Sequence, residues 1–162
     1  MHQERASASR PEGVLVCGTD IVLIEDLARA IEIGGEAVLA RFFTDAERQT
    51  CRDSIARLAA RLAAKEAIAK SLGTGLRGIG WREIEVVTHP NGRPELNLSG
   101  RALAAQSRLG IRRWRLSLSN SSEYALAFVV GDASSQPAEV GATLGLQMDG
   151  IASAFEQHII TH

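Results

Sequence analysis

The stretch ARLAAKEAIAKSLGTG, residues 60–75, decides the fold, because it is an alanine-rich helical sequence that runs directly into glycines. The same helix carries a carboxylate, Glu66, and an ammonium group one turn later, Lys70. An ion loses its hydration on burial, so a charge beside an apolar stripe requires a counter-ion or a bound cation. These two charges therefore point to a partner elsewhere in the chain.

This helix is predicted to extend over residues 45–72, which would make it the longest element of the chain. TDAE, residues 44–47, matches a capping box that opens it. Glu66 and Lys70 lie beside its apolar stripe. At the 3.6-residue period, that stripe consists of Ile55, Leu58, Leu62, Ala69 and Leu72.

The chain before this helix predicts one strand and two helical pieces. Residues 14–24, VLVCGTDIVLI, are apolar and β-prone, with an interruption at residues 18–20. Asp20 is the unusual residue there, because its surroundings are apolar. Helical spacing follows over residues 25–33 and is stopped by IGG, before a second helical piece near residues 38–43.

The chain after the helix predicts two hairpins and a short helix. The first hairpin joins residues 84–89 to residues 95–100 through the turn PNGRP. A helix follows over about residues 101–109. The second hairpin joins residues 112–119 to residues 124–130 through NSSE.

Length favours a single domain, because 162 residues are enough for one core but few for two. We expect a flexible N-terminal segment at residues 1–13, the domain at residues 14–130, and a linker with a tail at residues 131–162. The tail ends with helical spacing at Ile151, Phe155 and Ile159. It is expected to dock on the body, although a partner-binding or appended helix fits the same spacing.

Composition excludes several classes of partner and site. Eighteen Lys and Arg residues against nineteen Asp and Glu residues leave no global field for nucleic acid or an anionic membrane. Cys17 and Cys51 lack CxxC spacing and the four histidines are scattered, which argues against a Cys/His zinc site. No stretch has the character of a signal peptide or a membrane span, so we expect a cytoplasmic protein.

Asp20 and Glu66 together are candidate ligands for a magnesium ion. Mg²⁺ takes one or two protein carboxylates, keeps waters, and fills other positions with substrate phosphate oxygens. Each residue alone also has an ordinary explanation. Asp20 could cap a turn or a helix, and Glu66 could form an i,i+4 pair with Lys70, worth only ~0.3–0.5 kcal/mol.

Other polar residues allow contacts to phosphate, and each has a simpler explanation. Arg61, Lys65 and Lys70 fit a solvated helix face, and PNGRP fits an ordinary hairpin turn. SLSNSS, residues 117–122, offers hydroxyl and backbone N–H groups at a strand end, which suit a phosphate or a polar turn equally.

Five segments, read in order, resemble the holo-acyl-carrier-protein synthase group of 4′-phosphopantetheinyl transferases. They are GTDIV (18–22), FTDAE (43–47), ARLAAKEAIAKSLGTG (60–75), IEVVTHPNGRPEL (84–96) and SLSNSSEYALAFVV (117–130). The resemblance covers residues 14–130 and neither tail. It implies a single-domain α+β protomer with a small antiparallel sheet and a long packed helix, which would be alanine-rich because it packs closely.

The resemblance implies an enzyme that transfers 4′-phosphopantetheine from coenzyme A to a serine of an apo acyl carrier protein, releasing adenosine 3′,5′-bisphosphate. Asp20 and Glu66 would hold Mg²⁺ together with the pyrophosphate of coenzyme A. Glu66, directly or through a water, would act as the base, and Lys70 would face the leaving phosphate. Asp20, Glu66 and Lys70 are therefore the expected catalytic residues.

The resemblance also implies a homotrimer with active sites between protomers, so part of each coenzyme A site would come from a neighbouring chain. The residues concerned are Asn91, Gly92, Arg93 and Pro94 in the turn and Ser117, Ser119 and Asn120 at the strand end. Arg61 and Lys65 would add contacts to phosphate.

Asn120 departs from the group's pattern, because a histidine usually stands at this position. An amide donates a hydrogen bond but supplies no positive charge to the nucleotide phosphates, which a nearby arginine could provide instead. The alternative function that this departure favours is a non-catalytic coenzyme A or carrier-protein binding module.

The first helix is a second departure, because the group usually has a basic helix here that docks on an acidic carrier. Its charges in this chain are Glu25, Asp26, Glu32 and Glu36 against Arg29. A less acidic, pathway-specific carrier, or docking through Arg41 and Arg48, fits better than a strongly acidic fatty-acid carrier.

Overall fold

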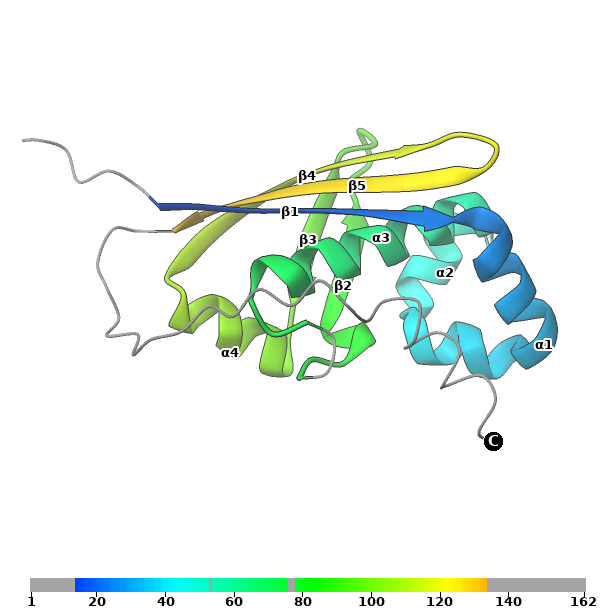
Figure 1. The fold of residues 1–162 in the computed structure, drawn as a ribbon, viewed down its shortest axis with the longest axis horizontal. Helices are drawn as coiled ribbons and strands as arrows, with labels where there is room; N and C mark the ends of the chain where they lie inside the picture. The colour runs from blue at the N-terminus through cyan, green and yellow to red at the C-terminus, as the bar shows by residue number, and fades with distance from the viewer. Residues whose placement is uncertain (1–13, 53, 76–77, 134–162) are drawn as a thin grey trace, which may run out of the picture.

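The computed structural model describes residues 14–52, 54–75 and 78–133, which form two layers (Figure 1). The upper layer in this view is a three-stranded antiparallel sheet in the order β1-β5-β4. Its strands are β1 (Val14–Leu23), β5 (Tyr124–Ala133) and β4 (Ile111–Asn120). Helix α3 (Ile55–Ser71) runs beneath the sheet and contacts β1 and β5. The predicted α+β class with a small antiparallel sheet is confirmed.

The remaining elements surround α3. A second antiparallel sheet pairs β2 (Ile84–Thr88) with β3 (Pro94–Leu98). The other helices are α1 (Ile24–Phe42), α2 (Asp45–Cys51) and α4 (Gly100–Arg108), and a 3₁₀ turn, η1 (Trp81–Glu83), precedes β2. Both predicted hairpins and the short helix are confirmed, although β5 continues to Ala133 instead of stopping at residue 130.

The predicted single helix over residues 45–72 is wrong, because two helices occupy this stretch. Arg52 adopts the left-handed conformation (φ 51°, ψ 40°) and ends α2, and α3 begins at Ile55. Helix α1 has 19 residues but is interrupted at Gly35, so α3, with 17 residues, is the longest uninterrupted helix of the described residues. The break lets α2 lie beside β2, where a Glu47 carboxylate oxygen accepts a hydrogen bond from the Val86 amide at 3.0 Å.

Helix α3 is buried on all sides rather than along one stripe. Every side chain from Leu58 to Ala69 is buried, because the sheet covers one side of the helix and α1, α2 and β2 cover others. The predicted five-residue stripe is only part of this surface. Glu66 therefore lies inside the core and not at its margin.

Strand β1 is continuous and includes residues 18–20, which interrupt only the apolar character of its sequence. Gly18 lies in mid-strand, where a Cβ atom would stand 2.3 Å from the Ala67 carbonyl oxygen and 2.3 Å from Ser71 Oγ. Only glycine allows α3 to approach the strand this closely. Asp20 is two residues further along and points to the same side as Gly18, over the helix.

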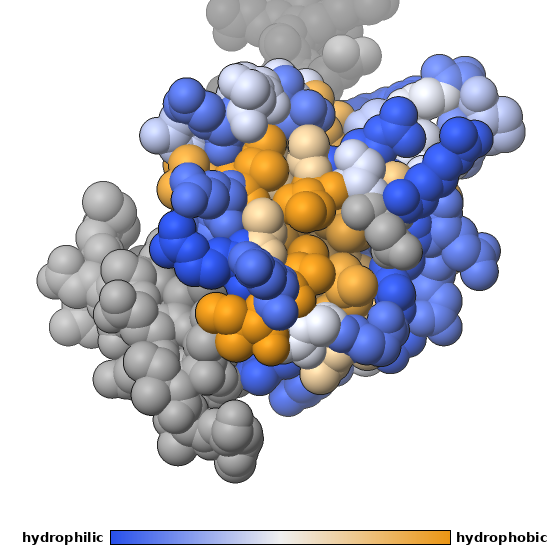
Figure 2. All heavy atoms as spheres, turned by 90° about the vertical axis from the view of Figure 1, so that its right-hand side faces the viewer, coloured by the Kyte–Doolittle hydropathy of each residue, from blue (hydrophilic) through white to orange (hydrophobic). Residues whose placement is uncertain are grey.

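Helix α1 bends at Gly35, whose φ of 56° is not helical, so the predicted stop at IGG is confirmed. Leu27 of α1 and Phe43 are fully buried in a cluster with residues of α3. Figure 2 shows this end of the molecule, where apolar side chains gather inside a ring of hydrophilic ones. The apolar side chains of α1 that only partly bury against the cluster include Ile31, Leu39 and Phe42.

The predictions for both ends of the chain lie outside the described residues. These are the N-terminal segment at residues 1–13 and the tail stripe Ile151, Phe155 and Ile159. Within the described residues, Cys17 is exposed and Cys51 is buried. None of the helices that the structure describes has the length and apolar character needed to cross a bilayer.

Candidate active site

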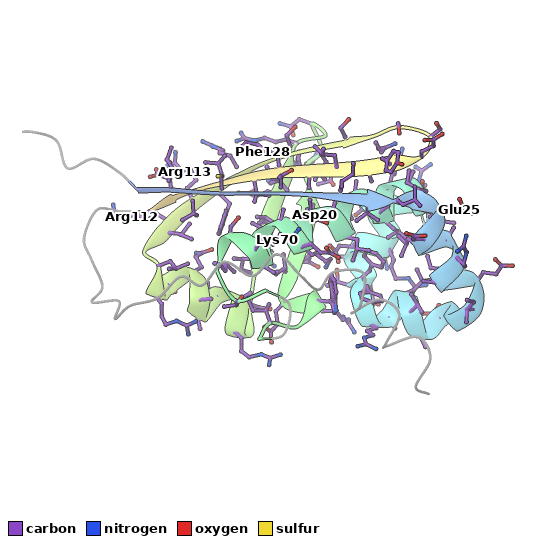
Figure 3. All side chains as sticks on the ribbon, viewed as in Figure 1. Asp20, Glu25, Lys70, Arg112, Arg113 and Phe128 are labelled. Atoms are coloured by element: carbon purple, nitrogen blue, oxygen red, sulfur yellow. The ribbon has the colours of Figure 1, made fainter. Side chains whose placement is uncertain are left out.

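Asp20 and Glu66 lie in the space between the sheet and α3. Asp20 pairs in register with Ala127 of the central strand, and its side chain is only 8% exposed. Lys70 of α3 forms an ion pair with Asp20 Oδ1, and Figure 3 shows these two side chains pointing toward one another from helix and strand. Lys70 therefore pairs with Asp20 across the layers and not with Glu66 four residues earlier.

The pKa of Glu66 reflects a second carboxyl group beside it. Burial, and after it the charge of Asp20 and a hydrogen bond with it, raise the pKa of Glu66 to about 8 from an ordinary value of 4.5. The positive charge of Lys70 acts in the opposite direction without outweighing these causes. At neutral pH and without a cation, Glu66 therefore holds a proton and forms a hydrogen bond with Asp20.

Two buried carboxyl groups that share one proton are a suitable donor set for a hard divalent cation, which would replace the proton as their counter-charge. Mg²⁺ fits this set, because it needs few protein ligands and leaves positions for water and phosphate oxygens. Across residues 14–52, 54–75 and 78–133, no group of three or more His, Cys, Asp or Glu side chains could hold a metal. A magnesium ion at Asp20 and Glu66 would therefore have two protein carboxylates, with water and phosphate oxygens in its other positions.

Lys65 is a structural residue and does not face a ligand. Its ammonium group is fully buried and donates hydrogen bonds to Glu47 Oε2 (2.8 Å) and to the carbonyl oxygens of Trp81 (3.0 Å) and Ile84 (2.5 Å). Desolvation lowers its pKa, whereas Glu47 acts to raise it. Because all three N–H groups are engaged inside the protein, the prediction that Lys65 contacts coenzyme A does not fit this position.

Glu47, the partner of Lys65, is also the last residue of the predicted capping box. Thr44 Oγ1 accepts a hydrogen bond from the Glu47 amide (3.2 Å), and Glu47 Oε2 accepts one from the Thr44 amide (2.9 Å). The capping box is therefore confirmed. It holds the Glu47 carboxylate in the core, where Lys65 meets it.

Arg61 is only 6% exposed and points toward the end of β2. It donates hydrogen bonds to Thr88 Oγ1 (2.8 Å) and to the Arg57 carbonyl oxygen (3.2 Å). Its Nε has no hydrogen-bond partner in the described part of the chain. Arg61 thus ties α3 to the β2–β3 hairpin, and its Nε is buried.

Ser117 lies on the opposite face of the sheet from Asp20. Ser117 pairs in register with Phe128, whereas its neighbour Leu118 pairs with Ala127, the partner of Asp20. Residues in register share a face, and consecutive residues alternate between faces. Figure 3 agrees, because Phe128 lies above the sheet and Asp20 beneath it. One chain therefore cannot bring Asp20 and Ser117 to the same part of a ligand.

This upper, outer face of the sheet is exposed and largely apolar. Its large exposed apolar side chains are Leu15, Ile21, Tyr124, Leu126 and Phe128. Ser119 pairs with Leu126 and so continues the same face, and Asn120 ends the strand beside it. An exposed apolar face of this kind marks an interaction surface.

The predicted turn forms one side of a cleft of about 260 Å³. Asn91 Oδ1 accepts a hydrogen bond from the Arg93 amide (3.0 Å), and Gly92 has a positive φ of 83° that closes the turn. The lining residues are His89, Asn91, Arg93, Pro94 and Glu95 of the hairpin and Trp114, Arg115 and Leu116 of β4.

Arg115 is one of the cleft residues that the sequence did not single out, with His89, Glu95, Trp114 and Leu116. RRWRLSLS contains three arginines, and their spacing alone does not tell which one meets the turn. The available signal was the two-residue alternation from Ser117, which places Arg115 on the same face as the predicted serine.

The acidic residues of α1 are partly paired within the protein. Arg29 forms an exposed pair with Glu25 (3.0 Å), and Arg48 of α2 forms a pair with Glu36 that includes a bond of 3.0 Å. Asp26 and Glu32 remain exposed. Helix α1 therefore presents acidic groups outward, with Glu25 at its start (Figure 3).

Comparisons with known proteins agree with one another over the described region. A family model described as the 4′-phosphopantetheinyl transferase superfamily matches residues 16–129. A curated relative from Herpetosiphon aurantiacus, a holo-[acyl-carrier-protein] synthase, is 48% identical over 125 residues, which are 73% of this chain and 98% of the relative.

Two solved structures have the same fold. The holo-[acyl-carrier-protein] synthase of Helicobacter pylori, crystallised with coenzyme A, is 27% identical with a TM-score of 0.65, covering 71% of this chain and 98% of that one. The corresponding synthase of Neisseria meningitidis is 37% identical with a TM-score of 0.64, covering 72% of this chain and 96% of that one.

Proposed function

The chain belongs to the 4′-phosphopantetheinyl transferase superfamily, and from this membership we propose that it is a holo-acyl-carrier-protein synthase. It transfers 4′-phosphopantetheine from coenzyme A to a serine of an apo acyl carrier protein and releases adenosine 3′,5′-bisphosphate. The observation that carries the proposal is the buried pair of carboxyl groups, Asp20 and Glu66, with Lys70 beside it. A module that only binds coenzyme A has no need of two carboxylates placed for a cation.

In the reaction, the serine hydroxyl oxygen forms a bond to the β-phosphorus of coenzyme A. The bond from that phosphorus to the bridging oxygen breaks, and the bridging oxygen leaves on adenosine 3′,5′-bisphosphate. The hydroxyl proton must go to a base, and the leaving phosphate must gain a proton or a positive partner.

Glu66 is the base in this proposal, directly or through a water. In the metal-free site its pKa of about 8 keeps the carboxyl protonated, and a bound cation would displace that proton and leave a carboxylate that can accept one. Lys70 is 41% exposed, so its ammonium group reaches the opening of the site and can stabilise or protonate the leaving phosphate.

Asp20 and Glu66 would hold Mg²⁺, because they are the paired carboxylates of the site and magnesium is a hard cation that prefers oxygen. When bound, Mg²⁺ supplies positive charge to the pyrophosphate of coenzyme A. Lys70 would then exchange its ion pair with Asp20 for a contact to phosphate. This exchange explains why a partly exposed lysine lies next to a buried carboxylate.

The active unit is a homotrimer whose sites lie between chains. The sheet register supports this arrangement, since Ser117 faces away from Asp20 within one chain. Burying the apolar outer face of the sheet against another copy would bring Ser117 and the turn of one chain toward the carboxylates of its neighbour. Ser117 and the turn of the third copy would in the same way approach the carboxylate pair of the first chain.

The coenzyme A contacts are assigned to surface residues, of which all but the half-buried Pro94 are exposed. They are Asn91, Gly92, Arg93 and Pro94 in the turn and Ser117, Ser119 and Asn120 on β4. Arg61 reaches the same hairpin from α3 through Thr88 and remains a candidate contact, whereas Lys65 is no longer one.

The carrier protein would dock at the end of the molecule formed by α1. Asp26 and Glu32 are exposed on α1, and this end of the molecule also carries the apolar patch of Figure 2. Together they suit a carrier helix with apolar contacts and few acidic groups. Fatty-acid or polyketide carriers, and a cytoplasmic location, remain predictions of the sequence.

Intact mass spectrometry tests the proposal. The protein is incubated with apo carrier proteins, coenzyme A and Mg²⁺, and we expect the phosphopantetheine mass increment on a carrier. The increment should disappear with EDTA and with Glu66→Gln, and persist with Asp45→Asn, a control at an exposed carboxylate of α2. Transfer that continued with Glu66→Gln would contradict the assigned chemistry, and coenzyme A binding without transfer to any carrier would favour a binding module.

A further inference from the structure

The cleft between the β2–β3 turn and β4 contains two arginines whose charges are not neutralised. Arg93 and Arg115 both line it, and both side chains are exposed. The acid of the cleft, Glu95, forms an ion pair with His89. The charge and hydrogen bond of His89 lower the pKa of Glu95 most, and Arg93 and Arg115 contribute less. The guanidinium groups of Arg93 and Arg115 have no hydrogen bond or ion pair among the described residues.

This combination of groups suits a phosphate on a nucleotide. Two arginines present N–H groups in the fork geometry that matches phosphate oxygens. The walls of the cleft also include the half-buried Trp114, whose ring nitrogen donates to Gln106 (2.8 Å), and Pro94. Pro94 offers apolar surface beside Arg93, whereas the Trp114 ring packs against the core on the inner face of the sheet.

Coenzyme A, on the proposed function, carries two sets of phosphates, and only one of them can reach the carboxylate site. The pyrophosphate must lie at Asp20 and Glu66, because the transferred bond is there. Arg115 pairs in register with Val130 and lies on the outer face, away from Asp20 of its own chain. A cation cluster on that face is therefore available for the remaining phosphate.

We propose that Arg115, together with Arg93, binds the 3′-phosphate of a coenzyme A molecule whose pyrophosphate lies at the carboxylate pair of a neighbouring chain. This inference rests on the proposed function and adds to it a residue that decides between coenzyme A and its dephospho form.

Steady-state transfer with coenzyme A and with dephospho-coenzyme A, which lacks the 3′-phosphate, tests this assignment. For Arg115→Gln we expect kcat/KM with coenzyme A to fall about 10-fold or more through KM, as for loss of a charge-assisted contact. With dephospho-coenzyme A, the variant should stay within about 2-fold of the unmodified protein. Arg93→Gln should behave in the same way, and Arg115→Lys should recover part of the loss.

Arg112→Gln is the matched control, because Arg112 is on the same strand and exposed but does not line the cleft. Figure 3 shows Arg112 and Arg113 at the beginning of β4. Its kinetics with both substrates should be unchanged. Three results would overturn the assignment. Arg115→Gln could lower kcat/KM equally with both substrates, it could lower kcat/KM with neither, or the unmodified protein could use both substrates equally well.

Calorimetric binding of the two nucleotides separates this inference from the proposed function. If no carrier is modified but coenzyme A still binds more tightly than its dephospho form through Arg115, the transferase proposal fails and the phosphate assignment stands. If transfer is active but Arg115→Gln binds both nucleotides as the unmodified protein does, only the phosphate assignment fails.

Discussion

Glu66 combines burial, a carboxylate neighbour and a nearby ammonium group, and each affects a different property of the site. Burial and the neighbouring Asp20 favour the protonated form of Glu66. The metal-free site therefore buries one negative charge fewer. A cation reverses this preference, because it stabilises both carboxylates in their ionised form. Metal binding should therefore release a proton from Glu66 below about pH 8.

The stability of the metal-free protein should depend on pH through Glu66. Its pKa is about 8 when folded and 4.5 ordinarily, so the folded state binds more protons between these values. The contribution of Glu66 is therefore complete below pH 4.5 and is lost as the pH rises to about 8. Glu66→Gln should be more stable than the unmodified protein at about pH 8 in EDTA, by on the order of 1 kcal/mol, and by less at about pH 5.

Urea unfolding in EDTA across this pH range measures the difference, with the exposed Glu32→Gln as control. Adding Mg²⁺ at about pH 8 should stabilise the unmodified protein and leave Glu66→Gln unchanged. If the gain in unfolding free energy from Glu66→Gln did not grow with pH, burial and Asp20 would not be raising the pKa of Glu66.

At the scale of elements, the buried pair of Lys65 and Glu47 connects α3, α2 and the start of β2. Lys65→Met would leave the Glu47 carboxylate buried without its counter-charge, at a cost of about 3–5 kcal/mol. Combining Lys65→Met with Glu47→Gln removes the stranded charge and should restore part of the stability. Urea unfolding measures these differences, with Arg57→Met as an exposed control on the same helix.

A Lys65→Met protein with unchanged unfolding free energy would mean that water reaches Glu47 when Lys65 is removed. A double variant that is less stable than Lys65→Met would show that the hydrogen bonds of Glu47 to backbone amides matter more than its charge.

The position of Lys65 was partly visible in the sequence. It lies three residues after Leu62 and four before Ala69, and so on the apolar stripe rather than on a solvated face. Its partner was not visible, because Glu47 reaches it only through the break at Arg52. A left-handed arginine gives no signal of the kind that Gly or Pro provides, since tertiary packing imposes it.

The strands and turns were easier to predict than the helix break, because the two-residue alternation of a strand and the residues of a turn lie within one short segment. PNGRP and NSSE marked both hairpins, and TDAE marked the helix start. In the site, motif residues identified Asp20, Glu66 and Lys70, but not which carboxylate Lys70 meets. That choice depends on how closely Gly18 lets β1 approach α3, which no pattern within one segment contains.

At the scale of the whole molecule, the apolar outer face of the sheet should hold the trimer together. Phe128 is 47% exposed at the centre of this face, so Phe128→Asp should give a folded monomer without transferase activity. Leu103→Asp on α4, at a side chain of 44% exposure, is the matched control and should stay trimeric. Sedimentation equilibrium should give three chains of 17.4 kDa for the unmodified protein and one for Phe128→Asp. An active monomer would refute a shared site.

The most direct test of a site shared between chains is complementation. One chain carries Glu66→Gln, and the other carries Arg93→Ala, Ser117→Ala and Asn120→Ala. The two variant chains carry different affinity tags and are co-expressed, and mixed oligomers are purified through both tags. Intact mass spectrometry of the carrier should show little transfer by either variant alone and restored transfer by the mixed oligomers, in which some sites combine an intact carboxylate pair with an intact turn and strand. Mixed oligomers that transfer no more phosphopantetheine than either variant alone would contradict it.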